Sequence, residues 1–263
     1  MRELERDHTE TATPSPTPAP PDSLAILGTG RAGGSIFNAA VAAGIDVSVG
    51  PRDGDVTGAE AVLICVPDGA IAEVCERVAP SLAPGVRIGH VSGATGLGAL
   101  RTAAAAGRET FSLHPLQTIP TPETDLTGAP CAISASSAES LGFARSLSEA
   151  LGMRPFGVPE EGRAAYHAAA SMASNFLVAL EESAASLMKA AGVADAREVL
   201  APLVLRSAAN WADSGAAALT GPIARGDEAT VALHLEALAQ HAPELRPLYE
   251  ALAVRTRDLG AGS

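Results

Sequence analysis

Near its N-terminus the chain reads Leu-Ala-Ile-Leu-Gly-Thr-Gly-Arg-Ala-Gly-Gly over residues 24–34. The apolar run at 24–27 predicts a buried strand, and the alanine-rich residues that follow the glycines predict a helix. Between them stands G-x-G-x-x-G, the phosphate-binding turn of dinucleotide-binding folds. In such a turn Gly28 permits a tight bend, Gly30 lets the backbone approach a pyrophosphate, and Gly33 lets helix and strand pack closely. The stretch therefore predicts a Rossmann-type domain.

Downstream of this turn, short apolar runs alternate with helix-like stretches, which is typical of a mostly parallel sheet covered on both faces. Further strands are predicted at 45–49, 61–66, 86–91, 110–113, 131–134 and 154–158. Helices are predicted at 32–43, 70–79, 97–106 and 138–151, with glycine caps at Gly44, Gly107 and Gly152. Residues 50–60 are rich in glycine and predict a loop in place of a full crossover helix.

After Gly162 the strand signals stop, and Ala, Leu, Met and Glu dominate. Helices are predicted at 163–191, 194–219, 227–240 and 244–259. The predicted fold is α/β, with a Rossmann-type mostly parallel sheet domain followed by an all-helical C-terminal domain. We assign 23–160 to the first, 161–263 to a helical substrate or dimerisation domain, and the proline-rich residues 1–22 to a disordered tail.

Composition narrows the function classes. The chain has 263 residues and a formal net charge of −12, so nucleic acids and anionic membrane surfaces would be repelled. No apolar run reaches the roughly 20 residues of a bilayer span, and no signal peptide opens the chain. Cys65, Cys75 and Cys131 lie in apolar runs without metal-ligand spacing. We expect a cytoplasmic protein with reduced core cysteines and no metal site.

The residues after the second predicted strand bear on cofactor choice. A site for NAD typically has Asp or Glu there, which accepts hydrogen bonds from the ribose hydroxyls. Here Val49 is followed by Gly-Pro-Arg52. Arg52, with Arg31 of the glycine turn, can hold the 2′-phosphate of NADP, so NADPH is the predicted cofactor. In the alternative, both arginines are solvated and Asp53 contacts the ribose.

Other residues are expected to touch the cofactor chiefly through their backbone. Thr29 and Ala32 belong to the glycine turn, and Val66, Pro67 and Asp68 follow the third strand, where open α/β sheets bind ligands. The Asp68 side chain itself is interpreted as the N-cap of the next helix.

Polar residues after the next two strands are candidates for chemistry. Ser92 follows one strand, and His114 and Gln117 follow the other. Reduction of a carbonyl or imine by NADPH also needs a proton, and an imidazole can donate it. We predict His114 as the acid/base, Ser92 as the residue that orients it or the substrate, and Gln117 as a substrate contact. The alternative for His114 is a structural role at the strand end.

A polar stripe marks the long predicted helix. His167, Ser171 and Asn175 recur at four-residue spacing beside the stripe that begins at Tyr166. The apolar residues 176–180 that follow are expected to be buried, which favours an inward-facing seam. We predict His167 and Asn175 as catalytic residues and Ser171 as a substrate contact; the alternative is a polar contact between helices. Whether His114 or this seam supplies the proton stays open.

A glycine-bounded loop at 220–227 carries one further candidate. Asp227 is interpreted as the N-cap of the next helix. Arg225 is a good bidentate partner for a substrate carboxylate, or alternatively for a helix C-terminus.

Several of these motifs occur together in one known family. They are Gly28 to Gly33, Val66-Pro67-Asp68, Ser92-Gly93, His114-Pro115-Leu116-Gln117-Thr118, Tyr166-His167-Ala168-Ala169-Ala170, Ser174-Asn175 and Leu219-Thr220-Gly221-Pro222-Ile223-Ala224-Arg225-Gly226-Asp227. The chain thus resembles bacterial oxidoreductases that join a Rossmann-like domain to a helical domain of unknown function (2520). Wider relatives are the 6-phosphogluconate and 3-hydroxyacid dehydrogenases, pyrroline-5-carboxylate reductase, ketopantoate reductase and prephenate dehydrogenase. The resemblance implies a helical domain similar to the C-terminal domain of 6-phosphogluconate dehydrogenase.

The resemblance implies two different catalytic arrangements. Hydroxyacid dehydrogenases use a Lys and an Asn four residues apart; Ser171 and Asn175 have that spacing, but the Lys is lacking. Prephenate dehydrogenases pair a Ser with the His of a His-Pro turn, which is similar to Ser92 and His114. The resemblance to ketopantoate-reducing proteins implies, by analogy, an NADPH-dependent reductase of a small 2-keto acid such as ketopantoate. The alternatives are an imine reductase of the pyrroline-5-carboxylate type and a non-catalytic NADP(H) sensor. Relatives also lead us to expect a homodimer.

Overall fold

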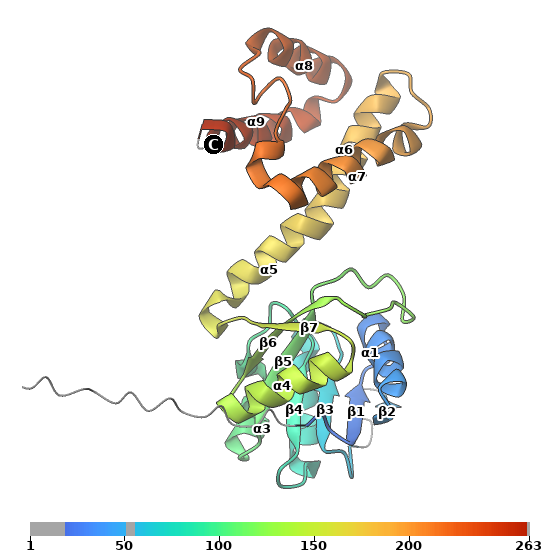
Figure 1. Ribbon diagram of the computed structural model, residues 1–263, viewed down its shortest axis with the longest axis vertical. Helices are drawn as coiled ribbons and strands as arrows, with labels where there is room; N and C mark the ends of the chain where they lie inside the picture. Colours follow the sequence, from blue (N-terminus) through green and yellow to red (C-terminus); the bar gives the residue numbers. More distant parts are fainter. Residues whose placement is uncertain (1–18, 51–55, 262–263) are drawn as a thin grey trace, which may run out of the picture. The chain divides into compact units, whose positions relative to one another are not determined.

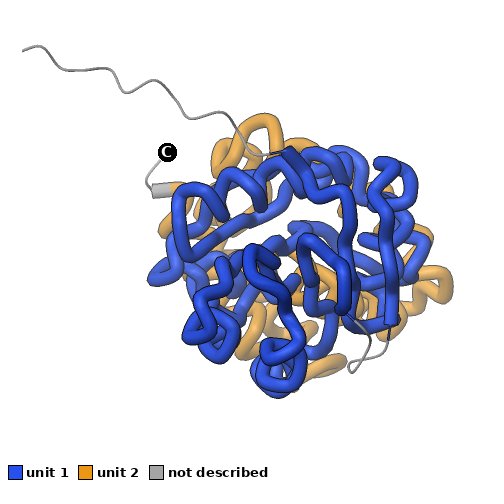
Figure 2. Tube along the Cα trace, turned by 90° about the horizontal axis from the view of Figure 1, so that it is seen from below, with its two compact units in different colours: residues 1–170 blue, residues 171–263 orange. Residues whose placement is uncertain are grey.

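The computed structural model describes residues 19–50 and 56–261. The chain divides into two compact units, Met1–Ala170 and Ser171–Ser263, which are coloured separately in Figure 2. The domain boundary predicted at residue 160 lies inside the first unit. No helix among the described residues is both long enough and apolar enough to cross a membrane.

The described part of the first unit is built on a seven-stranded sheet in the order β2-β1-β3-β4-β5-β6-β7 (Figure 1). Its strands are β1 Ser23–Leu27, β2 Asp46–Gly50, β3 Ala61–Ile64, β4 Arg87–His90, β5 Thr110–Pro115, β6 Pro130–Ala135 and β7 Arg154–Gly157. The strands β1 to β5 are parallel, β6 is antiparallel to β5, and β7 is parallel to β6. All predicted strands and the mostly parallel sheet are confirmed.

Helices cover both faces of this sheet. They are α1 Arg31–Ala42, α2 Ile71–Val78, α3 Arg101–Ala105 and α4 Ala138–Ala150, with short turns η1 Asp68–Ala70, η2 Ala79–Ser81, η3 Leu97–Leu100 and η4 Glu160–Gly162. One core cluster joins α1 and α4 to one face of the sheet, and a second joins α2 and α3 to the other. Gly44, Gly107 and Gly152 have φ of +76°, +73° and +79° at the helix ends, so the predicted glycine caps are confirmed.

Steric contacts explain why the turn after β1 contains glycine. Gly28 has φ +121°, and a Cβ placed on it would lie 2.3 Å from the carbonyl oxygen of Cys65. A Cβ on Gly33 would lie 2.1 Å from the carbonyl oxygen of Gly28. A Cβ on Gly30 meets no protein atom within 4 Å. The protein's own packing therefore requires glycine at two of these positions, and it leaves the space beside the third open.

The second half of the chain is helical, as predicted. Its elements are α5 Arg163–Ser171, the π-helical turn η5 Met172–Phe176, α6 Leu177–Ala190, α7 Ala196–Ser214, η6 Gly215–Ala218, α8 Glu228–His241, η7 Pro243–Leu245 and α9 Arg246–Ala261. The expectation of one regular α-helix over 163–191 was wrong, because the π turn interrupts it. That turn carries Ser174 and Asn175, and short polar side chains of this kind compete for backbone hydrogen bonds.

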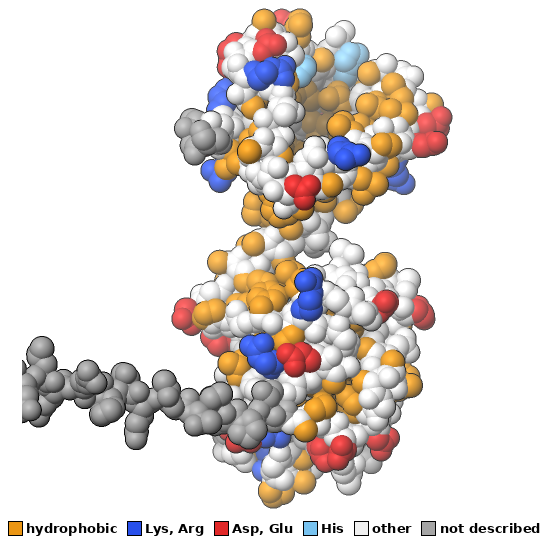
Figure 3. All heavy atoms as spheres, viewed as in Figure 1, with side chains coloured by type: hydrophobic (Ala, Val, Ile, Leu, Met, Phe, Trp, Pro, Cys, Tyr) orange, Lys and Arg blue, Asp and Glu red, His pale blue; other side chains and the backbone are white. Residues whose placement is uncertain are grey.

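The expectation that residues 176–180 are buried was also wrong. Phe176 and Val178 are each 62% exposed. The buried hydrophobic residues of the described second unit are Ala185, Ala196, Val231, Leu238, Ala242 and Ala253. Most of them are small, so the helices enclose only a thin core, and Figure 3 shows hydrophobic side chains spread over the surface of the helical unit.

Replacing Gly33 by alanine tests the packing of the glycine turn. The added Cβ would collide with backbone, which cannot rotate away as a side chain can. We expect the free energy of unfolding to fall by about 1–3 kcal/mol in urea denaturation. Gly69→Ala is the matched control, because a Cβ there meets nothing within 4 Å. Equal stabilities of the two variants would contradict this account.

Candidate active site

The carboxyl ends of the parallel strands meet along one edge of the sheet. The glycine turn follows β1 there, and Cys65 and Val66 follow β3; a Cβ on Gly28 would contact both of these residues. Ser92 and Gly93 follow β4, and His114 lies near the end of β5. In doubly wound sheets, ligands bind at this edge. The fold thus brings the predicted cofactor turn and the predicted acid/base to the same side of the sheet.

The N-terminus of α1 is suited to an anion. Its N-cap is Gly30, without a capping side chain, and its first turn holds no acidic residue. The first backbone N–H groups of a helix lack partners within the helix, and the helix dipole favours negative charge there. Thr29, Gly30 and Arg31 are exposed, and Ala32 follows them in the first turn. Arg52 and Asp53, the two candidates for the ribose side, lie outside the described residues.

The prediction that Asp68 caps a helix was wrong. The chain makes the 3-10 turn η1 at Asp68–Ala70 before α2 begins at Ile71. Pro67 therefore holds the N-cap position of η1, Ala70 holds that of α2, and neither helix has a side-chain cap bond. Asp68 is the first residue of η1, in the segment that follows β3.

A cluster of four residues from three elements surrounds His114; we call Gly93, His114, Tyr166 and His167 the histidine cluster. The Nδ1 atom of His114 lies 2.6 Å from the Oη atom of Tyr166. The ring centroids of His114 and His167 are 6.1 Å apart. A Cβ on Gly93 would lie 2.7 Å from Cε1 of His114 and 2.8 Å from Cδ2 of His167. A side chain at position 93 would collide with both imidazoles, which the structure places near each other.

Burial keeps the central pair of this cluster neutral. Desolvation, followed by the charges of His167 and Arg163, lowers the pKa of His114 to about 4. Desolvation is also the main cause that raises the pKa of Tyr166 to about 12. At neutral pH the imidazole is therefore uncharged and the phenol keeps its proton. If His114 acts as the acid, it therefore donates a proton from the neutral imidazole.

Arg163, at the start of α5, anchors the cluster to the sheet. Its side chain is only 4% exposed. One Nη atom donates to Ser112 Oγ at 2.6 Å, Ser134 Oγ at 2.8 Å and Glu160 Oε1 at 2.8 Å, and the other donates to the carbonyl of Ser92 at 3.3 Å. Ser112 and Ser134 are register partners on β5 and β6. A single guanidinium therefore joins β5, β6 and the turn after β4 to the helix that carries Tyr166 and His167.

Glu160 completes this anchor. Its second carboxylate oxygen accepts the backbone N–H of Leu97 at 2.9 Å. Burial alone would raise the pKa of Glu160, but the Leu97 N–H and Arg163 outweigh it and hold that pKa below its ordinary value. The buried arginine thus has an ionised partner, which a buried charge requires.

Ser92 builds the turn after β4. Its Oγ atom accepts the N–H groups of Ala94 and Thr95 at 3.2 and 2.9 Å. Its own N–H donates to Nδ1 of His90 at 3.2 Å. We expected Ser92 to orient the imidazole of His114 or the substrate. In this structure Tyr166 hydrogen-bonds to His114 and orients the imidazole.

The remaining predicted substrate contacts are placed as follows. Gln117 is exposed, and its amide donates to the carbonyl of Asp125 at 2.9 Å. Ser171 ends α5 and Asn175 lies in the π turn; both belong to the second unit. Arg225, also in the second unit, donates to the carbonyl of Thr220 and closes its own loop.

That loop also contains the predicted cap. Asp227 accepts the N–H of Thr230 at 3.1 Å as the N-cap of α8, as predicted.

Sequence reasoning missed four parts of the site: Tyr166, Gly93, Arg163 and His90. Tyr166 adjoins His167 in the sequence and was noted without a role. Two signals could have found the anchor. Serines inside two apolar strands need a buried partner, and Arg163 opens an apolar helix three residues after Glu160.

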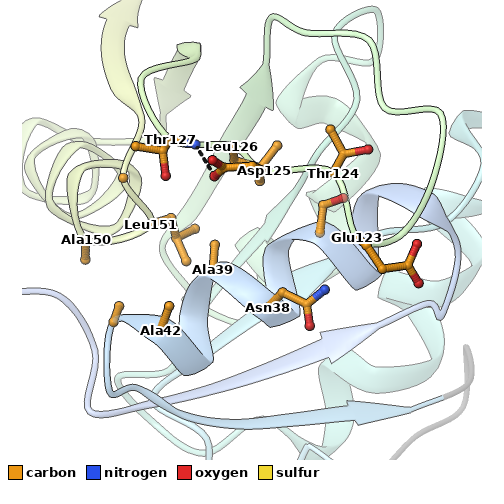
Figure 4. Close-up of a pocket in the computed structure, with 13 residues that line it drawn as sticks. Asn38, Ala39, Ala42, Glu123, Thr124, Asp125, Leu126, Thr127, Ala150 and Leu151 are labelled. Atoms are coloured by element: carbon orange, nitrogen blue, oxygen red, sulfur yellow. Dashed lines mark hydrogen bonds between the residues drawn. The ribbon is translucent and has the colours of Figure 1, made fainter.

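A cavity elsewhere in the first unit contains none of the predicted site residues. It measures about 340 Å³ and lies among α1, the loop at 123–127 and the end of α4 (Figure 4). Its polar lining includes Asn38, Glu123, Thr124 and Asp125. Ser35 also lines this cavity, and its hydroxyl donates to the carbonyls of Thr121 and Pro122. The cluster around His114 is therefore separate from this cavity.

Two family models match the chain. Residues 43–115 match the Rossmann-like domain, and residues 129–256 match DUF2520, a domain of unknown function. No curated protein matches the sequence significantly. The Rossmann-like domain and the helical 2520-type domain suggested by the motifs are both present.

Solved structures share this two-part fold. An NADP oxidoreductase, so named, from Bacteroides fragilis is 22% identical, with a TM-score of 0.74 over 90% of this chain and 98% of its own. Protein TM1727 from Thermotoga maritima is 20% identical, with a TM-score of 0.72 over 91% and 98% of the two chains. An imine reductase from Streptomyces aurantiacus is 18% identical, with a TM-score of 0.69 over 91% and 95%. At these identities the likeness shows the fold.

His90 lies behind the histidine cluster and makes stability depend on pH. It is fully buried, and its Nε2 atom has no hydrogen bond of normal geometry among the described residues. Desolvation, followed by the charge of Arg163, lowers its pKa to about 4 from the ordinary 6.5. Between these values the unfolded chain binds a proton that the folded chain excludes, so the free energy of unfolding should fall as the pH drops from 6.5 towards 4.

His90→Gln tests this dependence, because an amide cannot titrate in that range. We expect a shallower fall of the free energy of unfolding in the variant than in the wild type, measured by urea denaturation in steps from pH 7 to pH 4.5. Identical slopes would show that His90 is already charged in the folded protein.

Proposed function

We propose that this chain, which matches the Rossmann-like and DUF2520 family models, is an NADP-dependent oxidoreductase. Its substrate would be a small carbonyl or imine compound. One observation carries this proposal: the glycine turn and the neutral His114–Tyr166 pair lie at the same edge of the sheet, where the parallel strands end. The turn suits a dinucleotide, and the pair suits proton delivery.

The residues of the turn fit a dinucleotide on steric grounds. Glycine is required by the protein's own packing at Gly28 and Gly33 but not at Gly30, where a Cβ would stand in open space. A pyrophosphate fits that space, beside the uncapped N-terminus of α1. Arg31 opens the same helix and can contact a 2′-phosphate, with Arg52 as its partner. NADP also appears in the name of the Bacteroides fragilis neighbour.

The proposed chemistry divides between cofactor and chain. NADPH, when bound, supplies a hydride to the substrate carbon. His114 donates a hydrogen bond from Nε2 to the carbonyl oxygen or imine nitrogen and delivers the proton. His167, whose ring centroid lies 6.1 Å from that of His114, and Ser92, which precedes Gly93, orient the substrate. Burial strengthens these hydrogen bonds, because the local dielectric constant is low.

A small 2-keto acid, ketopantoate-like, is our first substrate class, with Gln117 as a candidate contact in the first unit. Arg225, Ser171 and Asn175 stay candidate contacts on the sequence argument alone. An imine is the second candidate. It is favoured by the imine reductase among the structural neighbours.

A homodimer and a reducing, cytoplasmic location complete the proposal. The described helical unit leaves Phe176, Leu177 and Val178 at least 40% exposed beside its thin core, and a second copy would cover such a surface. The three cysteines are free and buried, which suits a reducing compartment.

His114→Ala tests the assigned acid. We expect kcat/KM for NADPH oxidation to fall about 10²–10⁴-fold against a panel of keto acids, including ketopantoate, and cyclic imines, including pyrroline-5-carboxylate. The Kd of NADPH should stay within about threefold, because the side chain does not contact the phosphates. If NADPH binds tightly and the wild type reduces no member of the panel, a sensor without turnover replaces the enzyme.

Charge reversal at Arg31 and Arg52 tests the choice of cofactor. The double variant Arg31→Glu, Arg52→Glu should lose far more affinity for NADPH than for NADH, because only NADPH carries the 2′-phosphate. Fluorescence titration of both cofactors measures the two losses. Equal losses would refute the NADP preference and return the ribose contact to Asp53.

A further inference from the structure

We infer that Tyr166 supplies the proton that His114 passes on, so that the two residues act as one neutral relay. This inference rests on the proposed reductase function and names the residue that feeds its acid. Tyr166 does not replace His114 at the substrate; it is a positioning and proton-supplying residue that acts through the imidazole.

The first argument is the geometry of the pair. The Nδ1–Oη separation is 2.6 Å, at the short end for a hydrogen bond between a hydroxyl and an imidazole. The two rings stand nearly perpendicular, at 85°. The Tyr166 ring also makes an edge contact with the ring of Phe156, at a centroid distance of 6.0 Å and an angle of 67°. The phenol is therefore a fixed partner of Nδ1 and not a passing neighbour.

The second argument concerns which atom carries the proton. Burial leaves the imidazole neutral, so it has one N–H, and leaves the phenol protonated. The phenol is the stronger hydrogen-bond acid of the two neutral groups, so the Tyr166 O–H donates to Nδ1. The imidazole proton then sits on Nε2, the nitrogen that lies beside Gly93. Tyr166 thus selects the tautomer with a donor on the Gly93 side.

The relay must also balance its protons. As the hydride adds to the substrate carbon, the developing oxygen or nitrogen anion takes the proton from Nε2 of His114 while Nδ1 takes the phenol proton of Tyr166 in the same step, so the imidazole stays neutral. Afterwards Nδ1 returns this proton to the tyrosinate and a solvent proton binds Nε2, which restores the starting tautomer. This route explains how a histidine that resists protonation can still supply one proton in each turnover.

The helical unit offers a matched comparison. There His234 Nδ1 lies 2.8 Å from Tyr249 Oη, and the two rings are again nearly perpendicular, at 88°. The His234–Tyr249 pair joins α8 to α9. Tyr249→Phe removes the same kind of bond as Tyr166→Phe and serves as the control.

The kinetic test uses Tyr166→Phe with the best substrate of the panel described above. We expect kcat to fall about 10²–10⁴-fold with little change in the Kd of NADPH. The double variant Tyr166→Phe, His114→Ala should be no slower than His114→Ala alone, because residues that act as a unit are not additive. Tyr249→Phe should keep wild-type kcat. A purely structural Tyr166 would instead give additive losses.

A proton inventory in mixtures of H₂O and D₂O gives a readout that a structural role would not change. The rate of the wild type should depend on deuterium fraction with the curvature of two protons in motion, and that of Tyr166→Phe should depend on it linearly. A linear wild-type inventory, or full activity of Tyr166→Phe, would overturn the relay while leaving the reductase function standing.

Nitrogen-15 NMR of the His114 ring tests the pair without any substrate. In the wild type the proton should reside on Nε2, and Tyr166→Phe should shift the ring towards a mixture of tautomers. A wild-type proton on Nδ1 would overturn the inference. If the Nε2–H form is found and no panel member is reduced, the proposed function fails and the Tyr166 to His114 donation stands.

Discussion

The site depends above all on the buried guanidinium of Arg163. A charge inside a protein is tolerated only with well-placed partners, and here Ser112, Ser134, Glu160 and the Ser92 carbonyl provide them. Ser112 and Ser134 lie on β5 and β6, Ser92 follows β4 and Glu160 lies in η4, so these contacts hold the first residue of α5 against the sheet. Arg163, Tyr166 and His167 are three and four residues apart, so they share one side of α5. The anchor thereby fixes how the two aromatic side chains meet His114.

Burial also sets the protonation states of the residues in the site. The same desolvation that favours a neutral His114 also keeps Tyr166 protonated, so the pair holds two protons and no charge. A neutral site strengthens each hydrogen bond and does not repel an uncharged carbonyl or imine. The disadvantage is that the histidine cannot store an extra proton, and the relay through Tyr166 removes that disadvantage. At the glycine turn, by contrast, exposed backbone N–H groups provide the positive potential that phosphates need.

Much of this architecture could be predicted from sequence because it follows local rules. The glycine turn, all seven strands and the glycine caps each come from short patterns with a steric cause. Three predictions failed: a regular helix through Met172–Phe176, the burial of Phe176 and the capping role of Asp68. The pairing of Tyr166 with His114 spans 52 residues, and nothing local marks it. Arg163 looked like an ordinary first residue of a helix, since its partners lie on strands distant in sequence.

The central claim is that the glycine turn and the histidine cluster serve one bound NADPH. A crystal structure of the complex with NADPH measures this directly. The account predicts the pyrophosphate beside Gly30 at the N-terminus of α1, and the nicotinamide ring near Gly93, with room for one small substrate between its C4 atom and Nε2 of His114. A nicotinamide bound away from the histidine cluster, or a cofactor that leaves the glycine turn untouched, would contradict it.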